Sequence, residues 1–489
     1  MQYNARRPHP GRADLGAFLL FEIQVVVCRA SAVPPRSENL RALLPGGAAS
    51  PGPAGRVLEP TGATRAWRRA YVVARARPPV GGCLEAMEES MRSCRVVLWV
   101  AAGTASVGLT LPAPGLASTV RDESAHARRI HASLVGVDSH IDTLQRVLNE
   151  NVDVSRRQPS GHVDLPRLKE AGMVAPFFAL WVPTFYKDSE AVRRTLQLRD
   201  AMQSLLDAHP DQIELATSAA DVHRIARAGK IAAVLTLEGG HQIADDLAVL
   251  RVYHRLGIRS MTLTHFRNNH WADASTDRPQ HNGLTDFGRQ VVREMNRLGM
   301  IVDVSHASDK TFYDTLETTT KPVIASHSSC RALSDVPRNM TDEMIRALAR
   351  NGGVIGINFG AGFVSAKDAA ALRQRIGQAV ATEPDLVGRA LDDFARTDYL
   401  KEYGEMKPAA ATLDDAVAHI VHAVKIAGVD HVGIGSDWDG INMVPAGLED
   451  VSKMPALTAK LLERGFSEAD VRKILGGNHL RVLREVTGR

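Results

Sequence analysis

Short apolar runs alternate with helical patterns along most of the chain after about residue 133. Most of these runs are apolar throughout, as expected of strands that are buried on both faces of a parallel sheet. The predicted strands are residues 134–137, 175–182, 231–237, 260–264, 301–304, 323–325, 354–358 and 432–435.

The clearest helical pattern between these strands covers residues 412–427 and ends before Gly428. Thr412 and Asp415 form a capping box in which Asp replaces the usual Glu. The apolar positions on one face are Leu413, Ala416, Val417, Ile420, Val421 and Val424. Eight such strand–helix units predict an α/β fold of the (β/α)8 TIM-barrel type, with an open doubly wound sheet as the alternative.

The first part of the chain has a different character. Residues 1–90 are rich in Arg, Pro, Gly and Ala without a sustained period, so we expect a disordered or spurious extension there. Residues 91–117 have the layout of a signal peptide: Arg92 and Arg95, the apolar run 96–102, and small residues up to Ala117. An uncleaved anchor or a buried segment is the alternative. We expect a periplasmic or secreted protein whose barrel domain is residues 118–489.

The net charge of +4 belongs to this extension. Residues 1–117 contain 14 Arg, no Lys and 7 acidic residues, whereas residues 118–489 contain 45 basic and 48 acidic residues. The barrel domain is therefore mildly acidic, which gives no reason to expect a nucleic-acid partner. The chain ends without an apolar tail, so we expect a soluble protein with no membrane span after processing.

Cysteine usage limits the kinds of site that are possible. Cys330 is the only one of the four cysteines that follows residue 117. A disulfide framework and a multi-cysteine zinc site are both excluded from the barrel domain. Any metal in this domain must be held by histidines and carboxylates.

Polar residues follow six of the predicted strands at the point where each strand ends, and a (β/α)8 barrel brings all such ends to one mouth. Each residue alone is a weak signal, but a structural explanation of the whole set is improbable. The set consists of His140, Asp142, Glu238, His265, His306, His327 and Asp437.

The residue types and spacing suit a pair of metal ions. His140 and Asp142 are two positions apart, so both side chains lie on the same side of a strand. Imidazole and carboxylate without thiolate suit Zn²⁺. Glu238 has two oxygens and can bridge two ions, while His306 and His327 can complete the second site. Two ions about 3.5–4 Å apart would hold a bridging hydroxide that attacks a carbonyl.

From about residue 133 onward the chain resembles the membrane (renal) dipeptidase family of zinc metallopeptidases, a branch of the amidohydrolase superfamily. The motifs occur in the family's order over about 350 residues. They are Asp138-Ser139-His140-Ile141-Asp142, the segment 162–168, Glu238-Gly239-Gly240-His241, Leu263-Thr264-His265 with Asn268 and Trp271-Ala272-Asp273, Asp303-Val304-Ser305-His306, Ser326-His327-Ser328-Ser329 with Arg338-Asn339, Gly435–Gly440, the segment 447–453, and Gly477-Asn478.

The resemblance implies a zinc-dependent dipeptidase that uses two Zn²⁺ per chain and is a homodimer. His140, Asp142 and bridging Glu238 would hold one zinc, and Glu238, His306 and His327 the other. His265 would polarise the scissile carbonyl. Arg338 would bind the carboxylate of the dipeptide, and Asp437 would move the proton from the attacking hydroxide to the leaving amine. Family members accept many dipeptides, some with a C-terminal D-residue, and some open the β-lactam ring of carbapenems.

Several alternatives stay open at this point. Arg338 could cap a helix or pair with Asp335 on the surface, and Asp437 could be a buried turn residue. Asp138, His241, Asp303 and Asp439 are interpreted as supporting or structural residues. His419, His422 and His431 are interpreted as surface residues.

The functional alternatives are an amidohydrolase acting on N-acyl amino acids or lactams, or a non-catalytic binding protein on the same barrel. The run Gly360-Ala361-Gly362-Phe363 replaces bulkier residues of some relatives, which leaves the shape of the substrate pocket open. We expect helices over the mouth from residues 364–411.

Overall fold

The computed structural model describes residues 125–371 and 409–488. Its strands are β1 (Phe177–Trp181), β2 (Ile213–Leu215), β3 (Ile231–Glu238), β4 (Ile258–Thr262), β5 (Ile301–Asp303), β6 (Ile324–Ser328), β7 (Val354–Ile357) and β8 (Val432–Ile434). All pair in parallel, in the order β1-β3-β4-β5-β6-β7-β8, and β2 pairs with the beginning of β3. Seven of the eight predicted runs overlap these strands, whereas β2 was not predicted.

The remaining predicted run leads into the segment that closes the ring. Ile141 bridges Phe178 of β1 on one side and Trp438, just after β8, on the other. Backbone hydrogen bonds from Ser139 N to the Ile434 carbonyl and from Ala179 N to the Ile141 carbonyl fix both seams. Because this segment pairs on both sides, it closes the strand path from β1 to β8 into a ring, with β2 as a short addition beside β3. The predicted (β/α)8 barrel is confirmed, and the open doubly wound sheet is wrong.

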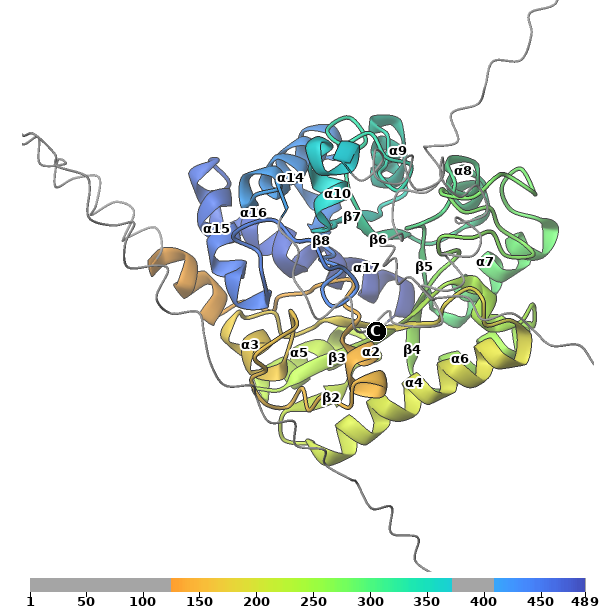
Figure 1. The fold of residues 1–489 in the computed structure, drawn as a ribbon, viewed down its shortest axis with the longest axis horizontal. Helices are drawn as coiled ribbons and strands as arrows, with labels where there is room; N and C mark the ends of the chain where they lie inside the picture. Colours follow the sequence, from red (N-terminus) through yellow and green to blue (C-terminus); the bar gives the residue numbers. More distant parts are fainter. Residues whose placement is uncertain (1–124, 372–408, 489) are drawn as a thin grey trace, which may run out of the picture. The chain divides into compact units, whose positions relative to one another are not determined.

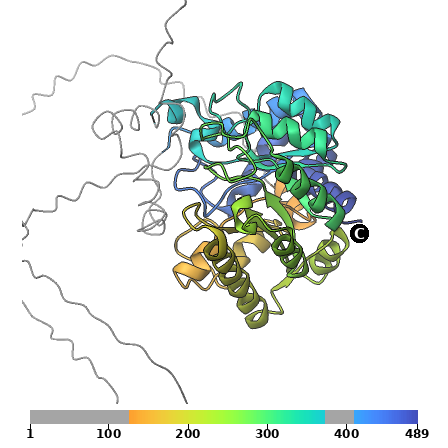
Figure 2. The same cartoon turned by 90° about the vertical axis from the view of Figure 1, so that its right-hand side faces the viewer.

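Helices follow the strands and surround them (Figure 1). They are α2 (Thr143–Asn149), α3 (Leu165–Glu170), α4 (Asp188–Ala208), α5 (Ala219–Arg227), α6 (Leu247–Arg255), α7 (Asp286–Leu298), α8 (Asp309–Thr318), α9 (Asp342–Arg350), α10 (Ala361–Val364), α14 (Leu413–Ala427), α15 (Met454–Glu463), α16 (Glu468–Arg472) and α17 (Asn478–Thr487). Neighbours in the outer layer pack in chain order, with α6 on α7, α7 on α8, α8 on α9 and α9 on α14 (Figure 2).

Local sequence explains where these helices begin and end. The Thr285 hydroxyl accepts a hydrogen bond from Gly288 N at the start of α7, and Gly299 ends the helix in the left-handed conformation. The predicted capping box of Thr412 and Asp415 is present at the start of α14. Apolar positions three and four residues apart then face the strands, so burial of that face stabilises each helix.

The C-terminal segment covers the barrel at the amino ends of the strands. It comprises the π-helix η5 (Lys473–Gly477) and α17. Val137 N donates to the Leu475 carbonyl, and the Asn478 amide donates to the carbonyls of Val429 and Val432. This segment therefore ties the first barrel strand to β8 at the end opposite the predicted site.

Two expectations lie outside the described residues. These are the signal peptide and extension in residues 1–117 and most of the mouth segment, 372–408. In the described part of the chain, no helix has both the length and the apolar content needed to cross a membrane.

Close approach of β8 to β6 gives the first prediction. A Cβ atom added to Gly435 would lie 1.6 Å from the Ser326 carbonyl oxygen, so this position requires glycine. Gly435→Ala should lower the free energy of unfolding by at least about 2 kcal/mol, measured by urea denaturation. Gly477→Ala is the matched control, since Gly477 has helical φ and ψ of −54° and −38°. Equal midpoints for the two variants would contradict this packing.

Candidate metal centre

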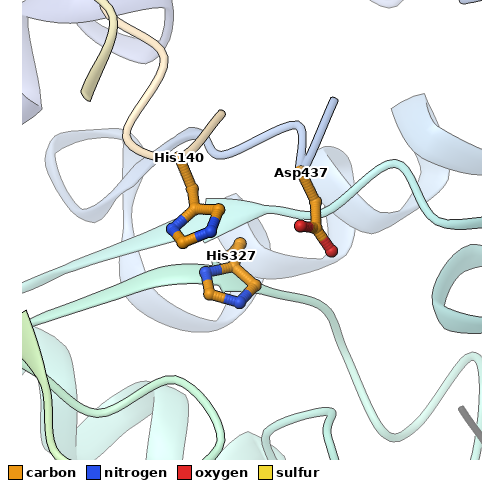
Figure 3. A group of neighbouring side chains, drawn as sticks. All are labelled: His140, His327 and Asp437. Atoms are coloured by element: carbon orange, nitrogen blue, oxygen red, sulfur yellow. The ribbon is translucent and has the colours of Figure 1, made fainter. Parts of the chain in front are cut away.

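The predicted site residues lie together at the carboxyl ends of the barrel strands. Glu238 ends β3, His327 lies in β6, and His306 follows β5. Figure 3 shows His140, His327 and Asp437 pointing toward one another, and the rings of His140 and His327 lie with centroids 3.8 Å apart. Parallel strands therefore bring together side chains that are almost 300 positions apart in the sequence.

The Glu238 carboxylate lies between two groups of side chains. Its Oε1 lies 3.1 Å from His306 Nε2, 3.3 Å from His327 Nε2 and 3.6 Å from His265 Nε2. Its Oε2 lies 3.4 Å from His140 Nε2, which is also 3.4 Å from Asp142 Oδ2. Each oxygen of one carboxylate thus faces its own set of possible ligands.

These atoms fit metal ions better than they fit one another. Both ring nitrogens of His140, Nδ1 of His306 and Oδ1 of Asp142 are buried and lack a hydrogen-bond partner in the described part of the chain. Leaving such atoms unpaired costs about 1–3 kcal/mol each, and an ion at the centre would remove that cost for the atoms that bind it. Three groups have one ligand atom per residue within 4.8 Å of one another: His140-Asp142-Glu238, Glu238-His265-His306 and His140-His327-Asp437.

Burial and charge set the protonation of the centre. Burial opposes ionisation of Glu238, but His140 and His265 hold its pKa well below the usual value. Burial lowers the pKa of His327, lowers that of His306 well below its usual value, and lowers that of His265 to about 3. These three imidazoles are therefore neutral at neutral pH and have a lone pair available for a cation.

His140 and Asp142 both release a proton less readily than they would in water. Burial and the Glu238 carboxylate raise the pKa of Asp142 to about 8. Burial disfavours the charged His140 ring, yet Glu238 and Asp142 raise its pKa well above the usual value. A cation must displace any such proton, so its affinity should fall as the pH is lowered.

Arg338 is a buried cation beside these groups. Its Nη2 donates to the His327 carbonyl at 3.0 Å, while Nε and Nη1 have no hydrogen-bond partner among the described residues. Its guanidinium lies 5.3 Å from the Phe363 ring centroid. Burial lowers the pKa of Arg338 to about 10, so it is still charged at neutral pH. With 3% exposure, Arg338 does not form a surface ion pair, and that alternative is wrong.

Asp437 is held in place by its neighbours. The Asn358 amide donates to Asp437 Oδ2 at 2.9 Å, and the Asn358 Oδ1 is occupied by Gly360 N. Asp437 and His306 have positive φ angles of 66° and 64°, which non-glycine residues seldom adopt. Sequence reasoning did not identify Asn358 as part of the site, because an amide at the end of β7 has no distinctive spacing.

The residues interpreted as supporting groups contact the backbone and side chains around the site. Asp138 Oδ1 accepts from His140 N and Ser436 N, and burial raises its pKa to about 6. Asp439 accepts from His162 N and from the Thr143 hydroxyl.

The predicted surface position of His419 is wrong. His419 is 1% exposed; its Nδ1 accepts from Cys330 N, and its Nε2 lies 3.2 Å from the Val364 carbonyl oxygen. It is buried because this position of α14 faces the loop after β6. The apolar pattern of the helix alone did not reveal this orientation.

The placement of Glu238 generates a prediction about metal content. Glu238→Gln replaces one ligand oxygen by an NH₂ group, so we expect the protein to lose most of its bound metal while keeping its circular dichroism spectrum. Mass spectrometry of metals measures the loss. Glu214→Gln, which affects an exposed pair with Arg224 and Lys230, is the matched control and should bind as the unchanged protein does. Full metal occupancy in Glu238→Gln would contradict the central position of this carboxylate.

Comparisons with known proteins agree with this arrangement. Residues 124–488 match the model of the family described as membrane dipeptidase (peptidase family M19). Dipeptidase tcpJ of Claviceps purpurea is 40% identical over 336 residues, covering 67% of this chain and 70% of that protein. Dipeptidase ataJ of Aspergillus terreus is 36% identical over 356 residues, covering 67% and 77%.

Two solved structures are also similar. The probable dipeptidase PvdM of Pseudomonas aeruginosa has a TM-score of 0.66 and 29% identity, covering 75% of this chain and 99% of that one. A metallo peptidase from Rhodobacter sphaeroides, liganded with a phosphinate mimic of L-Ala-D-Ala, has a TM-score of 0.60 and 26% identity, covering 72% and 99%. The chain belongs to the membrane dipeptidase family, peptidase family M19, whose members are metal-dependent, and it is a peptide-bond hydrolase.

Proposed function

We propose that this chain is a two-zinc dipeptidase that hydrolyses the single amide bond of a dipeptide. The observation that carries the proposal is the Glu238 carboxylate, whose two oxygens face two separate groups of ligand atoms. Buried Arg338, with two unpaired donors, lies close enough to this carboxylate to interact with it electrostatically. A cationic group next to a metal centre suits a small substrate with a free carboxylate.

The proposed ligands follow the two oxygens of Glu238. His140, Asp142 and Glu238 Oε2 would hold one zinc, and Glu238 Oε1, His306 and His327 the other. When bound, the two ions supply Lewis-acid polarisation of the scissile carbonyl and lower the pKa of a coordinated water. The remaining chemistry falls to protein side chains at the same mouth.

His265 is proposed to bind the carbonyl oxygen of the scissile bond. Its ring is neutral because burial lowers its pKa to about 3, so it donates one hydrogen bond without adding a charge. Phe266 lies edge-on to the ring with centroids 4.2 Å apart, and the Trp181 ring lies 5.5 Å away. These aromatic contacts limit ring rotation, which keeps the donor in place as negative charge develops on the oxygen.

Arg338 is proposed to bind the C-terminal carboxylate of the dipeptide. A guanidinium offers parallel N–H donors that match the two oxygens of a carboxylate. Nε and Nη1 lack partners among the described residues, and one of them forms a parallel pair with the second hydrogen of Nη2, so donors remain for this task. The ligand of the Rhodobacter sphaeroides relative mimics L-Ala-D-Ala, which supports including substrates with a C-terminal D-residue in the proposal.

Asp437 is proposed to carry the proton from the attacking water to the leaving amine. It lies in the group with His140 and His327, and Asn358 occupies its Oδ2. Its other oxygen, Oδ1, is the atom proposed to take the proton. Export through residues 91–117 to the periplasm or the medium, and assembly as a homodimer, are also part of the proposal.

The direct test is metal analysis combined with a screen of L-L, L-D and glycyl dipeptides. Two zinc ions per chain and turnover of dipeptides are expected. Turnover of N-acyl amino acids or lactams without dipeptides would favour the wider amidohydrolase alternative. Less than one metal per chain with no hydrolysis would favour a binding protein.

Replacing Asp437 separates proton transfer from metal binding. Asp437→Asn should keep both metals and lower kcat about 100-fold or more, since general acid–base catalysis typically contributes 10²–10⁴. Asp309→Asn, which affects a pair with Arg331, is the control and should keep full activity. Loss of metal from Asp437→Asn would instead identify Asp437 as a ligand.

Replacing Arg338 tests recognition of the substrate carboxylate. Arg338→Met should raise KM for free dipeptides about 10- to 100-fold, because a charge-assisted hydrogen bond contributes about 1.5–3 kcal/mol. Hydrolysis of C-terminally amidated dipeptides should change much less. Arg346→Met, which affects an exposed pair with Glu343, is the matched control. An equal loss for free and amidated dipeptides would remove Arg338 from carboxylate binding.

A further inference from the structure

His327 differs from the other two proposed histidine ligands in the partner of its second ring nitrogen. Nδ1 of His140 and Nδ1 of His306 have no hydrogen-bond partner among the described residues. Nδ1 of His327 lies 2.8 Å from the Ser326 hydroxyl oxygen. That hydroxyl in turn lies 2.5 Å from Asp303 Oδ2. A continuous chain of hydrogen bonds thus leads from a buried carboxylate to one imidazole of the centre.

The carboxylate of Asp303 determines the direction of these hydrogen bonds. Its Oδ1 accepts from Ser305 N at 3.0 Å and from Ser326 N at 2.9 Å. Its Oδ2 accepts from the Thr262 hydroxyl at 2.6 Å and lies beside the Ser326 hydroxyl. An ionised carboxylate has about four acceptor positions, and four donors surround this one. The Ser326 hydrogen is therefore used toward Asp303.

A hydroxyl has a single hydrogen, so the proton between Ser326 and His327 must come from the ring. His327 Nδ1 then donates to Ser326 Oγ, and His327 Nε2 has the lone pair. One atom of the contact between His306 Nε2 and His327 Nε2 at 2.9 Å must accept, and with this tautomer the acceptor is His327. The lone pair of Nε2 points to the side where Glu238 Oε1 lies at 3.3 Å.

We infer that Asp303 and Ser326 are positioning residues that fix the tautomer of His327, so that its Nε2 is always ready to bind a cation. This inference rests on the proposed two-metal centre. Orientation of a ligand histidine by an outer hydrogen-bond partner commonly changes metal affinity 10- to 100-fold. Here the carboxylate acts through a serine hydroxyl, and Thr262, Asp303, Ser326 and His327 are all at most 1% exposed.

Fold geometry explains why this chain of bonds forms. Thr262 and Asp303 are register partners on β4 and β5, and Ser326 lies in β6 two residues after Ile324, the partner of Asp303. Hydrogen bonds of Asp303 thus connect β4, β5 and β6 next to the residues of the proposed metal centre. His327 N also donates to the Ser305 hydroxyl, which connects the loop of His306 to the same network.

Two substitutions separate proton placement from packing. Ser326→Ala removes the acceptor of Nδ1. Asp303→Asn places an NH₂ donor near the Ser326 oxygen, which turns the Ser326 hydrogen toward His327 Nδ1 and moves the ring proton to Nε2. Ser329→Ala is the matched control, since Ser329 is buried directly after the same strand and its hydroxyl donates to the Asn358 carbonyl.

The first measurement is ¹⁵N NMR of histidine-labelled, metal-free protein, with the His327 signals identified by their loss in His327→Gln. We expect an Nδ1–H ring in the unchanged protein and in Ser329→Ala, and an Nε2–H ring in Asp303→Asn. An Nε2–H ring in the unchanged protein would overturn the inference. The same His327 tautomer in the unchanged protein and in Asp303→Asn would also overturn it.

The second measurement is Zn²⁺ affinity in competition with a chromophoric chelator. Ser326→Ala and Asp303→Asn should each weaken one of the two sites about 10- to 100-fold and leave the other unchanged. The double variant should bind Zn²⁺ no more weakly than the more affected single variant. Both changes break the same relay, the chain of hydrogen bonds from Asp303 through Ser326 to His327. Fully additive losses would overturn the relay. If the unchanged protein binds no zinc, the proposed function fails, while the NMR result still decides the tautomer.

Discussion

The carboxylate of Glu238 is the group on which the rest of the site depends. It is 3% exposed at the end of a fully buried strand, and desolvation alone would favour its protonated form. The surrounding imidazoles reverse that preference and hold it ionised. Its negative charge in turn raises the pKa of His140 and Asp142, so the protonation of the whole centre follows from one anion.

The barrel makes this arrangement possible because the residues that stabilise the fold and the polar residues of the site occupy different parts of each strand. Apolar residues fill the body, and the C-terminal segment seals the amino ends through Leu475 and Asn478. At the carboxyl ends, most strands contribute one or two polar groups that would be costly to bury singly. Asp138 and Asp303 accept backbone N–H groups directly beneath these residues, so the loops that hold the imidazoles have little freedom.

Much of the fold and the composition of the site could be predicted from the sequence, because both depend on patterns of neighbouring residues. Continuous apolar runs mark strands that are buried on both faces, and a polar residue directly after such a run marks the mouth. The three residues of β2 are too few to form a pattern. Asn358 and Ser326 could not be assigned roles, since these depend on which atom of a neighbouring strand lies within hydrogen-bond distance. His419 was misplaced because a polar residue can be buried when a loop supplies two backbone partners.

The closure of the ring has a consequence for the order in which the molecule is made. His140 and Asp142 belong to the first barrel strand, which pairs with β1 on one side, whereas its partners on the other side, β8 and Leu475, come near the end of the chain. On the ribosome, the first half of the polypeptide therefore emerges with one side of this strand still unpaired. The ring can therefore close only after nearly the whole chain has been made, so the full set of polar side chains at the mouth is assembled late, when β8 and the last helix have docked.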